Sequence, residues 1–194
     1  MGTRDPEATK QRILHAALRE FSDKGIAGAR VDAIAARACV NKRMLYYYFG
    51  SKEDLFREIL QRRIDENSAA STDQDVAAPG RLARRQRRLA AEEDYVRLLA
   101  WEALESRTGP VIDESVRRAY FTQWVKAVEA EQRAGRVPAD LDAAQLVLSE
   151  LCLVLGPLMV PQLTRLITGC SPTGARQLER RGAFLDVLEH RIDH

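Results

Sequence analysis

The chain has 194 residues, of which 45% are hydrophobic and 30% charged, as expected of a folded soluble protein long enough to bury a core. Its three cysteines are odd in number and widely spaced, and its three histidines form no metal-ligand spacing with them; this disfavours a disulfide framework and a zinc site, and we expect no cofactor. The first ten residues contain no apolar export signal, so the sequence favours a cytoplasmic protein.

The charge of the chain is unevenly distributed. The formal net charge is +2, but residues 1–52 contain ten Lys or Arg residues and only five Asp or Glu residues. A basic first quarter on a mildly acidic remainder indicates that the N-terminal part contacts a polyanion.

The apolar residues recur three and four positions apart throughout, which predicts an all-α fold. Asp5 and Pro6 favour the start of a first helix, and Gly25 favours its end. A second helix is expected over 31–38. Asn41 is a suitable N-cap for a third helix over 42–49.

Gly50 is expected to end the third helix, and "SKED" at 51–54 predicts a capping box that opens a fourth. Residues 65–80 are small and polar, as in a linker, although part of them could extend the fourth helix. Five further helices are predicted, at about 81–91, 92–106, 113–134, 142–167 and 174–192.

The apolar segment 146–163 is nearly long enough to span a membrane. It contains Glu150 and two prolines, so we interpret it as a buried helix that bends at Gly156-Pro157. No membrane association is expected.

The second and third helices, joined by a three-residue turn, have the dimensions of a helix-turn-helix motif. Lys42 and Arg43 lie in the first turn of the third helix, from which they could donate to guanine O6 and N7. Tyr46 and Tyr48 are expected to donate to DNA phosphates, whereas Tyr47 is expected in the core. Lys52 adds a cation at the start of the fourth helix.

Residues 10–60 resemble the N-terminal DNA-binding domain of the TetR family of bacterial transcriptional regulators. The matching segments are "AALREFSDKG", "VDAIAARA" and "LYYYFGSKEDL", in order and at family spacing. The resemblance implies a three-helix DNA-binding domain at 1–52, followed by a helical ligand-binding and dimerisation domain at 53–194.

The resemblance also carries residue roles onto this chain. It places a phosphate-contacting tyrosine at Tyr46, a second polar contact at Tyr48 and the helix-opening lysine at Lys52. Arg30 stands where members often carry Thr or Ser, and could still reach a phosphate. Cys39 stands where the family usually has Gly, so a left-handed backbone there would cost about 1 kcal/mol.

Four residues of the second domain are candidates for an effector pocket, with the hydrophobic core as the alternative interpretation for the aromatic ones: Trp101, Tyr120, Trp124 and Glu150. The run "RLARRQRR" at 81–88 could touch nucleic acid, but a solvated, salt-bridged helix face is favoured.

The predicted function is a repressor that binds a palindromic operator as a homodimer through its last two helices. The resemblance implies that it is released or re-set by a small molecule in the C-terminal domain. An enzyme is disfavoured because no phosphate loop or catalytic constellation is present in the sequence. A helical ligand-binding module without DNA binding is a second alternative, which Lys42, Arg43 and Lys52 disfavour.

Overall fold

The computed structural model describes residues 5–69, 78–105, 111 and 113–192, and over these ranges every regular element is a helix. This confirms the all-α prediction. The helices group into two compact units, Met1–Glu66 with Arg97–Asp113 (unit 1) and Asn67–Val96 with Glu114–His194 (unit 2). The functional boundary expected after residue 52 stays a prediction. Part of the predicted linker, 70–77, and the predicted break at 108–110 lie outside the described residues.

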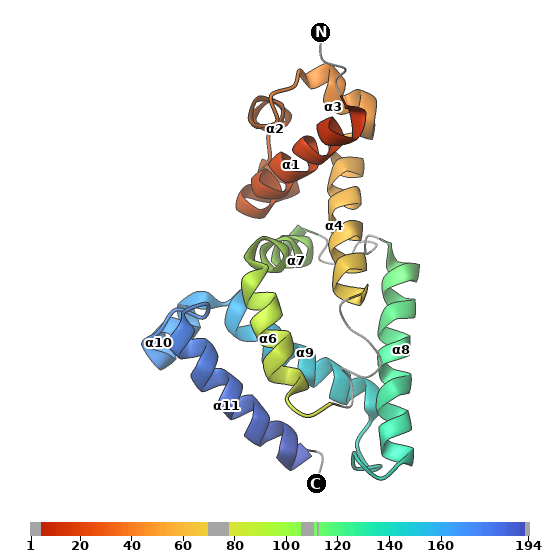
Figure 1. Ribbon diagram of the computed structural model, residues 1–194, viewed down its shortest axis with the longest axis vertical. Coiled ribbons are helices and arrows are strands. Elements are labelled where there is room, and N and C mark those ends of the chain that lie inside the picture. The colour runs from red at the N-terminus through yellow and green to blue at the C-terminus, as the bar shows by residue number, and fades with distance from the viewer. Residues whose placement is uncertain (1–4, 70–77, 106–110, 112, 193–194) are drawn as a thin grey trace. The chain divides into compact units, whose positions relative to one another are not determined.

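The helices of unit 1, drawn as ribbons in Figure 1, begin and end at residues with local capping chemistry. Helix α1 (Pro6–Gly28) begins after Asp5, whose side chain accepts from the Glu7 N–H, and its regular backbone is interrupted at Gly25. Three further helices follow: α2 (Val31–Arg37), α3 (Lys42–Phe49) and α4 (Lys52–Ala69), the last of which belongs to unit 1 as far as Glu66. Their inward residues form the core of the unit: Ile13, Phe21, Ile34, Leu45, Leu55 and Leu60.

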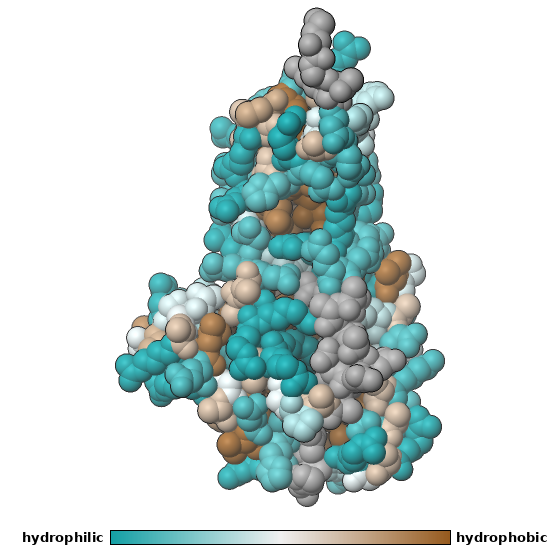
Figure 2. Space-filling view, viewed as in Figure 1, coloured by the Kyte–Doolittle hydropathy of each residue, from teal (hydrophilic) through white to brown (hydrophobic). Residues whose placement is uncertain are grey.

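Unit 2 is built from α6 (Arg81–Ala91), α8 (Glu114–Arg133), α9 (Ala143–Met159), α10 (Pro161–Thr168) and α11 (Ala175–Ile192). Helix α6 packs against both α9 and α11, and α8 packs against α9 (Figure 1). Helix α7 (Glu93–Glu105) continues from unit 2 into unit 1 at Val96–Arg97. On the face drawn in Figure 2, hydrophilic residues cover most of the described surface.

The helix predicted over 142–167 is divided at a different place from the one expected. The chain bends by 85° at Val160, between α9 and α10, and Pro157 lies inside α9. Pro161 causes this bend, because proline disfavours helical geometry in the residue before it, here Val160.

Each of these prolines removes one N–H from the helical hydrogen-bond ladder, and a side chain replaces it. The Arg181 guanidinium donates to the Leu153 carbonyl at 2.8 Å, four residues before Pro157. The Thr164 hydroxyl donates to the Pro157 carbonyl at 2.9 Å, four residues before Pro161. Among the described residues no single helix is long and apolar enough to cross a membrane, although α9 and α10 together meet that test by length and composition.

Candidate nucleic-acid interface and effector site

Helices α2 and α3 are joined by a turn whose hydrogen bonds follow a Schellman motif. The Val40 N–H bonds to the Ala35 carbonyl at 3.0 Å, and the Cys39 N–H bonds to the Ala36 carbonyl at 3.1 Å. Cys39 is the left-handed residue of this motif, with φ 54°. The left-handed conformation expected at Cys39 is therefore present.

Helix α3 begins at Asn41, whose side chain accepts from the Met44 N–H at 2.8 Å, and ends at Gly50 with φ 76°. Its inward face is formed by Leu45 and Phe49, which lie four residues apart and are buried. Because one side of α3 is fixed to the core in this way, its opposite side is held toward solvent.

The predicted DNA-contacting residues of α3 lie on or beside this exposed side. Lys42 and Arg43 are exposed and Tyr46 is 42% exposed, whereas Tyr48 is only partly so. The Lys42 ammonium lies 3.2 Å from the Asp32 carboxylate on α2. Both side chains are largely exposed, so this ion pair competes weakly with a phosphate.

The expectation that Tyr47 belongs to the core is wrong. Its side chain is 82% exposed, the largest value among the three tyrosines. Residues two apart on a helix face nearly opposite directions, so the burial of Leu45 and Phe49 turns Tyr47 outward. Tyr47 is also four residues after Arg43 and shares its face, a spacing that the sequence analysis could have used.

Arg30 and Lys52 lie at the starts of α2 and α4, the helices that precede and follow α3. Arg30 is the N-cap residue of α2 and is exposed, and its backbone N–H lies 3.3 Å from a carboxylate oxygen of Glu20. Lys52 is the first residue of α4 and is partly exposed. The Ser51 hydroxyl accepts from the Asp54 N–H at 2.9 Å, as the capping-box prediction requires.

Glu20 is a buried carboxylate that connects α1 to the start of α2. Lys24 donates to it at 2.7 Å, and Arg37 lies 4.0 Å away. Burial raises the pKa of Glu20, but the hydrogen bonds from Lys24 and the Arg30 N–H, with the charges of Lys24 and Arg37, outweigh burial and lower it. Glu20 therefore stabilises the position from which α2 and α3 leave α1.

The four candidate effector residues divide between the two units. Trp101 belongs to unit 1, where its indole N–H donates to the Ser22 carbonyl of α1 at 3.1 Å. Arg97, one turn earlier on α7, donates to the same carbonyl at 2.9 Å. Glu105, one turn later, accepts from the Ala27 N–H at 3.2 Å. These three residues hold α1 on both sides of its break at Gly25.

The other three candidates, Tyr120, Trp124 and Glu150, lie in unit 2. The rings of Tyr120 and Trp124 are 6.3 Å apart, and Trp124 belongs to a hydrophobic cluster between α8 and α9. Glu150, on α9, is 1% exposed and accepts from Arg81 at 2.8 Å. The arginine partner that a buried glutamate requires is therefore supplied by α6.

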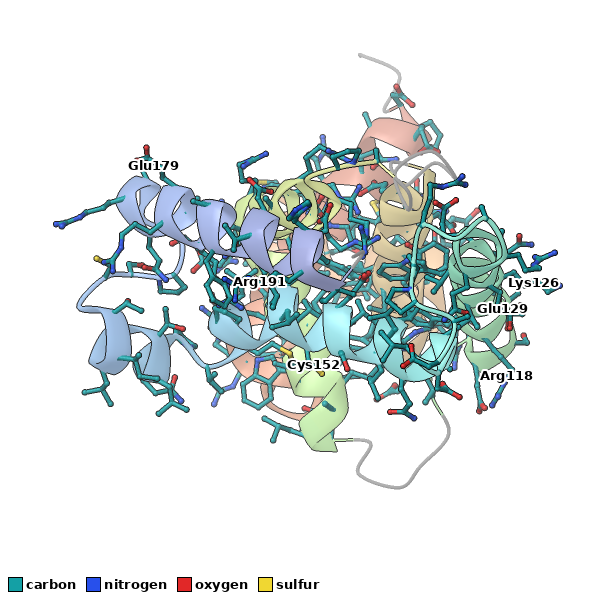
Figure 3. All side chains as sticks on the ribbon, turned by 90° about the horizontal axis from the view of Figure 1, so that it is seen from below. Arg118, Lys126, Glu129, Cys152, Glu179 and Arg191 are labelled. Carbon is teal, nitrogen blue, oxygen red and sulfur yellow. The ribbon has the colours of Figure 1, made fainter. Side chains whose placement is uncertain are left out.

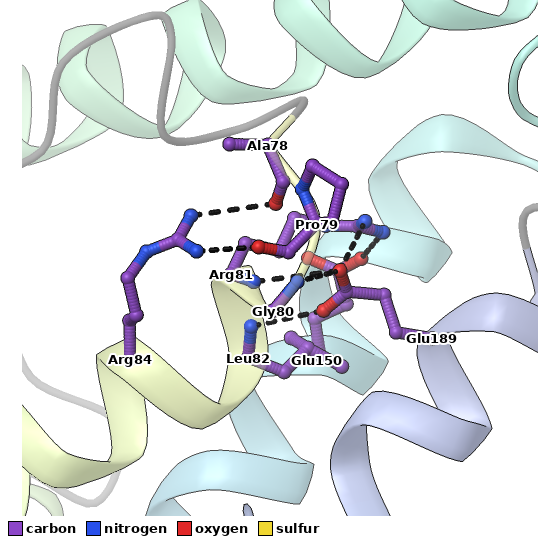
Figure 4. A network of polar contacts seen from close by, with 8 residues as sticks. All are labelled: Ala78, Pro79, Gly80, Arg81, Leu82, Arg84, Glu150 and Glu189. Atoms are coloured by element: carbon purple, nitrogen blue, oxygen red, sulfur yellow. Dashed lines mark hydrogen bonds and ion pairs between the residues drawn. The ribbon is translucent and has the colours of Figure 1, made fainter.

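The interpretation of the arginine run as a wholly solvated face is wrong for two of its members. Arg81 and Arg85 are buried, whereas Arg84 and Arg87 are exposed. Arg81 binds Glu150 at 2.8 Å and Glu189 at 3.3 Å (Figure 4). Their four-residue spacing places Arg81 and Arg85 on one inward face of α6.

Glu189, on α11, also caps the N-terminus of α6. Its carboxylate accepts from the backbone N–H groups of Gly80 at 2.7 Å, Arg81 at 3.4 Å and Leu82 at 3.1 Å (Figure 4). A carboxylate at this end of a helix satisfies free N–H groups and opposes the helix dipole. No local sequence pattern marks Glu189 as a cap, because its partners lie more than 100 residues away.

A shallow surface on the outer side of α8 is lined mainly by polar and charged residues. Arg118 and Lys126 are among its lining residues and point away from the neighbouring helices of unit 2 (Figure 3). It therefore lacks the enclosure of a small-molecule site.

Helix α3 is short, is capped by Asn41 and is joined to α2 by a tight turn, and it exposes lysine, arginine and tyrosine side chains. These are the features of the recognition helix of a helix-turn-helix DNA-binding protein. Residues 13–59 match the model of the bacterial regulatory proteins of the TetR family, and residues 78–187 match the tetracycline repressor-like C-terminal domain. The chain belongs to the TetR family of transcriptional regulators, whose members are not enzymes.

Relatives cover most of the chain. The HTH-type transcriptional repressor SCO4008 of Streptomyces coelicolor is 36% identical over 175 residues, which are 90% of this chain and 91% of that protein. The repressor NicS of Pseudomonas putida is 47% identical over 55 residues, 28% of this chain and 26% of that protein. The crystal structure of the transcriptional regulator SCO4942 of Streptomyces coelicolor superposes with a TM-score of 0.78 at 26% identity, covering 94% of this chain and 97% of that one.

Proposed function

We propose that this DNA-binding regulator is a ligand-responsive repressor that recognises a palindromic operator as a homodimer. The observation that carries the proposal is the one-sided arrangement of α3, in which Leu45 and Phe49 are buried while Lys42, Arg43 and Tyr47 face solvent. The 36% identity to a transcriptional repressor over nine-tenths of the chain supports repression as the sign of regulation. The site of action is the cytoplasm.

The DNA contacts divide into two kinds. Lys42, Arg43 and Tyr47 lie where side chains of α3 would meet base edges in the major groove. The residues around them are expected to contact phosphates: Arg30, Tyr46, Tyr48 and Lys52. Phosphate contacts position the protein on the DNA but do not distinguish one base sequence from another.

A dimer is required because one recognition helix reads too few base pairs for useful specificity. Two residues on α11, Phe184 and Val187, are 51% and 56% exposed, and Leu166 and Ile167 on α10 are each 81% exposed. Exposed apolar residues of this size favour contact with a second copy through the C-terminal helices. The variant Val187→Glu is expected to be monomeric in analytical ultracentrifugation and to lose operator binding.

The effector is expected to bind in unit 2, near Tyr120, Trp124 and Glu150, and to favour a state in which the two recognition helices no longer fit adjacent major grooves. Trp101 belongs to the response through its contacts with α1. A hundredfold loss of operator affinity requires about 2.7 kcal/mol of coupling between the two sites.

The test is selection of bound sites from a random duplex DNA pool by the full-length protein, followed by titration on the enriched sequence. A palindrome whose half-sites lie about one helical turn apart or somewhat more is expected. Retention of DNA without any enriched sequence would contradict an operator-reading function. An enriched palindrome bound by a monomer would contradict the dimer.

A further inference from the structure

Arg85 is a buried cation whose charge no neighbouring carboxylate contacts. Its side chain is 8% exposed, and its guanidinium carbon lies 3.5 Å from the centre of the Trp124 ring. Over the described ranges, no carboxylate lies within ion-pair distance of Arg85, and its Nη1 atom has no hydrogen-bond partner. Arg81, one turn earlier, binds two carboxylates.

The two carboxylates near Arg85 do not pair with it. Glu189 binds the N-terminus of α6 and Arg81, and Glu150 Oε1 accepts from Arg81. Glu150 Oε2 is buried without a hydrogen-bond partner among the described residues and forms no ion pair with Arg85. The pKa of Arg85 is lowered to about 10, mainly because the side chain is buried. Glu150 and Tyr120 oppose this shift, and the positive charges of Arg88 and Arg81 add to it. Arg85 is still a cation at neutral pH, in surroundings that favour an added anion.

A second unpaired donor lies beside the guanidinium. The indole Nε1 of Trp124 is buried without a hydrogen-bond partner among the described residues, and Trp124 is 6% exposed. Buried N–H groups are nearly always paired, so two adjacent unpaired donors indicate that an acceptor is missing. A carboxylate supplies two acceptor oxygens and a negative charge.

The same region offers an apolar surface for the rest of a ligand. Phe121 stacks against Trp124 with ring centres 6.3 Å apart and planes 15° from parallel, and Tyr120 contacts both rings. Tyr120, Phe121 and Leu151 are only partly buried, so this apolar surface extends from the buried donors toward solvent.

We propose that the Arg85 guanidinium and the Trp124 indole N–H form the anion-binding end of the effector site, and that the effector is a small organic carboxylate with an aromatic or aliphatic body. This inference rests on the ligand response proposed above and specifies its chemistry. The carboxylate accepts from Arg85 Nη1 and Trp124 Nε1, and its body lies along Tyr120 and Phe121. Glu150 keeps Arg81 from competing for the ligand.

The test compares ligands that share a body and differ in charge. Benzoate, octanoate, their primary amides and benzylamine are titrated into the full-length protein by calorimetry, at one ionic strength. At least one carboxylate is expected to bind ten times or more tightly than its amide, and benzylamine is expected to bind no better than benzamide. Equal or tighter binding of an amide or of benzylamine would overturn the proposal, as would the absence of binding by both carboxylates at millimolar concentration.

Substitutions at Arg85 and Trp124 test whether the carboxylate binds at these two residues. Arg85→Gln is expected to weaken carboxylate binding at least tenfold, to the level of the amide, and Trp124→Phe to weaken it several-fold while the ring is kept. Arg87→Gln makes the same charge change on the exposed side of α6 and is expected to leave the affinity within twofold. If Arg85→Gln keeps its carboxylate affinity and its helical circular dichroism is unchanged, Arg85 does not bind the carboxylate and the assignment is wrong.

The same samples separate this proposal from the proposed regulation. If the protein selects a palindromic operator but no carboxylate binds through Arg85, the effector assignment fails and the DNA-binding function stands. If a carboxylate binds through Arg85 but no DNA sequence is enriched, the site stands and the operator-reading function fails.

Discussion

Replacing Gly25 by alanine is expected to destabilise unit 1 severely. The backbone conformation at this position is unfavourable for any residue with a side chain, and neighbouring atoms leave no space for a Cβ atom. Its φ of 67° and ψ of 176° lie in a region that costs residues other than glycine about 1–3 kcal/mol. A Cβ atom there would lie 2.5 Å from the Glu105 carboxylate and 2.8 Å from the Trp101 ring. Moving Trp101 and Glu105 breaks their bonds to Ser22 and Ala27, at about 1 kcal/mol each. The total is about 3–5 kcal/mol.

Two other glycines separate the backbone cost from the steric cost. Gly169 has φ 72° but no atom within 4 Å of an added Cβ, so Gly169→Ala is expected to cost about 1 kcal/mol. Gly156 lies inside α9 with equally open surroundings, but it precedes Pro157, which disfavours helical geometry in a residue that carries a Cβ. This offsets the gain of about 0.5–1 kcal/mol expected for alanine in a helix, so Gly156→Ala is expected to change stability by less than about 0.5 kcal/mol. The assay is urea unfolding of the three variants, with hydrogen exchange of peptides covering 22–29 to locate the change. A cost at Gly25 no greater than that at Gly169 would refute the argument.

Three further substitutions test the interface and the buried network. Lys52→Gln is expected to weaken binding to all DNA sequences alike and to reduce the slope of log K against log salt by about 0.9, and a sequence-dependent loss would contradict a phosphate contact. Glu189→Ala is expected to cost about 3 kcal/mol in urea unfolding because it leaves the α6 N-terminus without its acceptor and removes one of the two carboxylates that bind buried Arg81, whereas the exposed Glu179→Ala should cost less than about 0.5 kcal/mol. Glu20→Gln is expected to flatten the pH dependence of the unfolding free energy below pH 4.5: the lowered pKa of Glu20 gives stability that is present above the ordinary value of 4.5 and lost as the pH falls through the lower folded value. An unchanged acid limb in that variant would show that Glu20 is not the group responsible.

The helix ends were predictable because capping chemistry is local. Asp5, Asn41 and Gly50 each act within four residues of their own position, so the printed sequence contains all the information that fixes them. The same holds for the left-handed turn at Cys39, once the family pattern has placed it.

The sequence could not assign burial to polar residues whose partners are distant. Arg81 and Arg84 are alike in sequence, and only the carboxylates of Glu150 and Glu189, 69 and 108 residues away, make the first a buried residue. Tyr47 was misplaced for a different reason. Three consecutive tyrosines contain no periodicity, so the direction of each depended on Leu45 and Phe49 rather than on its own chemistry.

Helices α6 and α7 form the segment of chain that leads from Arg85 of the proposed effector site to the contacts with α1. The helix that carries Arg85 ends at Ala91, two residues before α7 begins at Glu93, and α7 then holds Ser22 through Arg97 and Trp101. Trp101→Phe keeps the ring but removes its bond to Ser22. We therefore expect operator affinity and carboxylate affinity each to stay within about threefold, while the effector-induced loss of operator affinity falls by about 0.5–2 kcal/mol. Titration of labelled operator with and without effector measures this difference, and Trp124→Phe is the contrasting variant, since it should weaken effector binding itself. If Trp101→Phe leaves the coupling unchanged, α1 receives the signal through contacts other than Trp101.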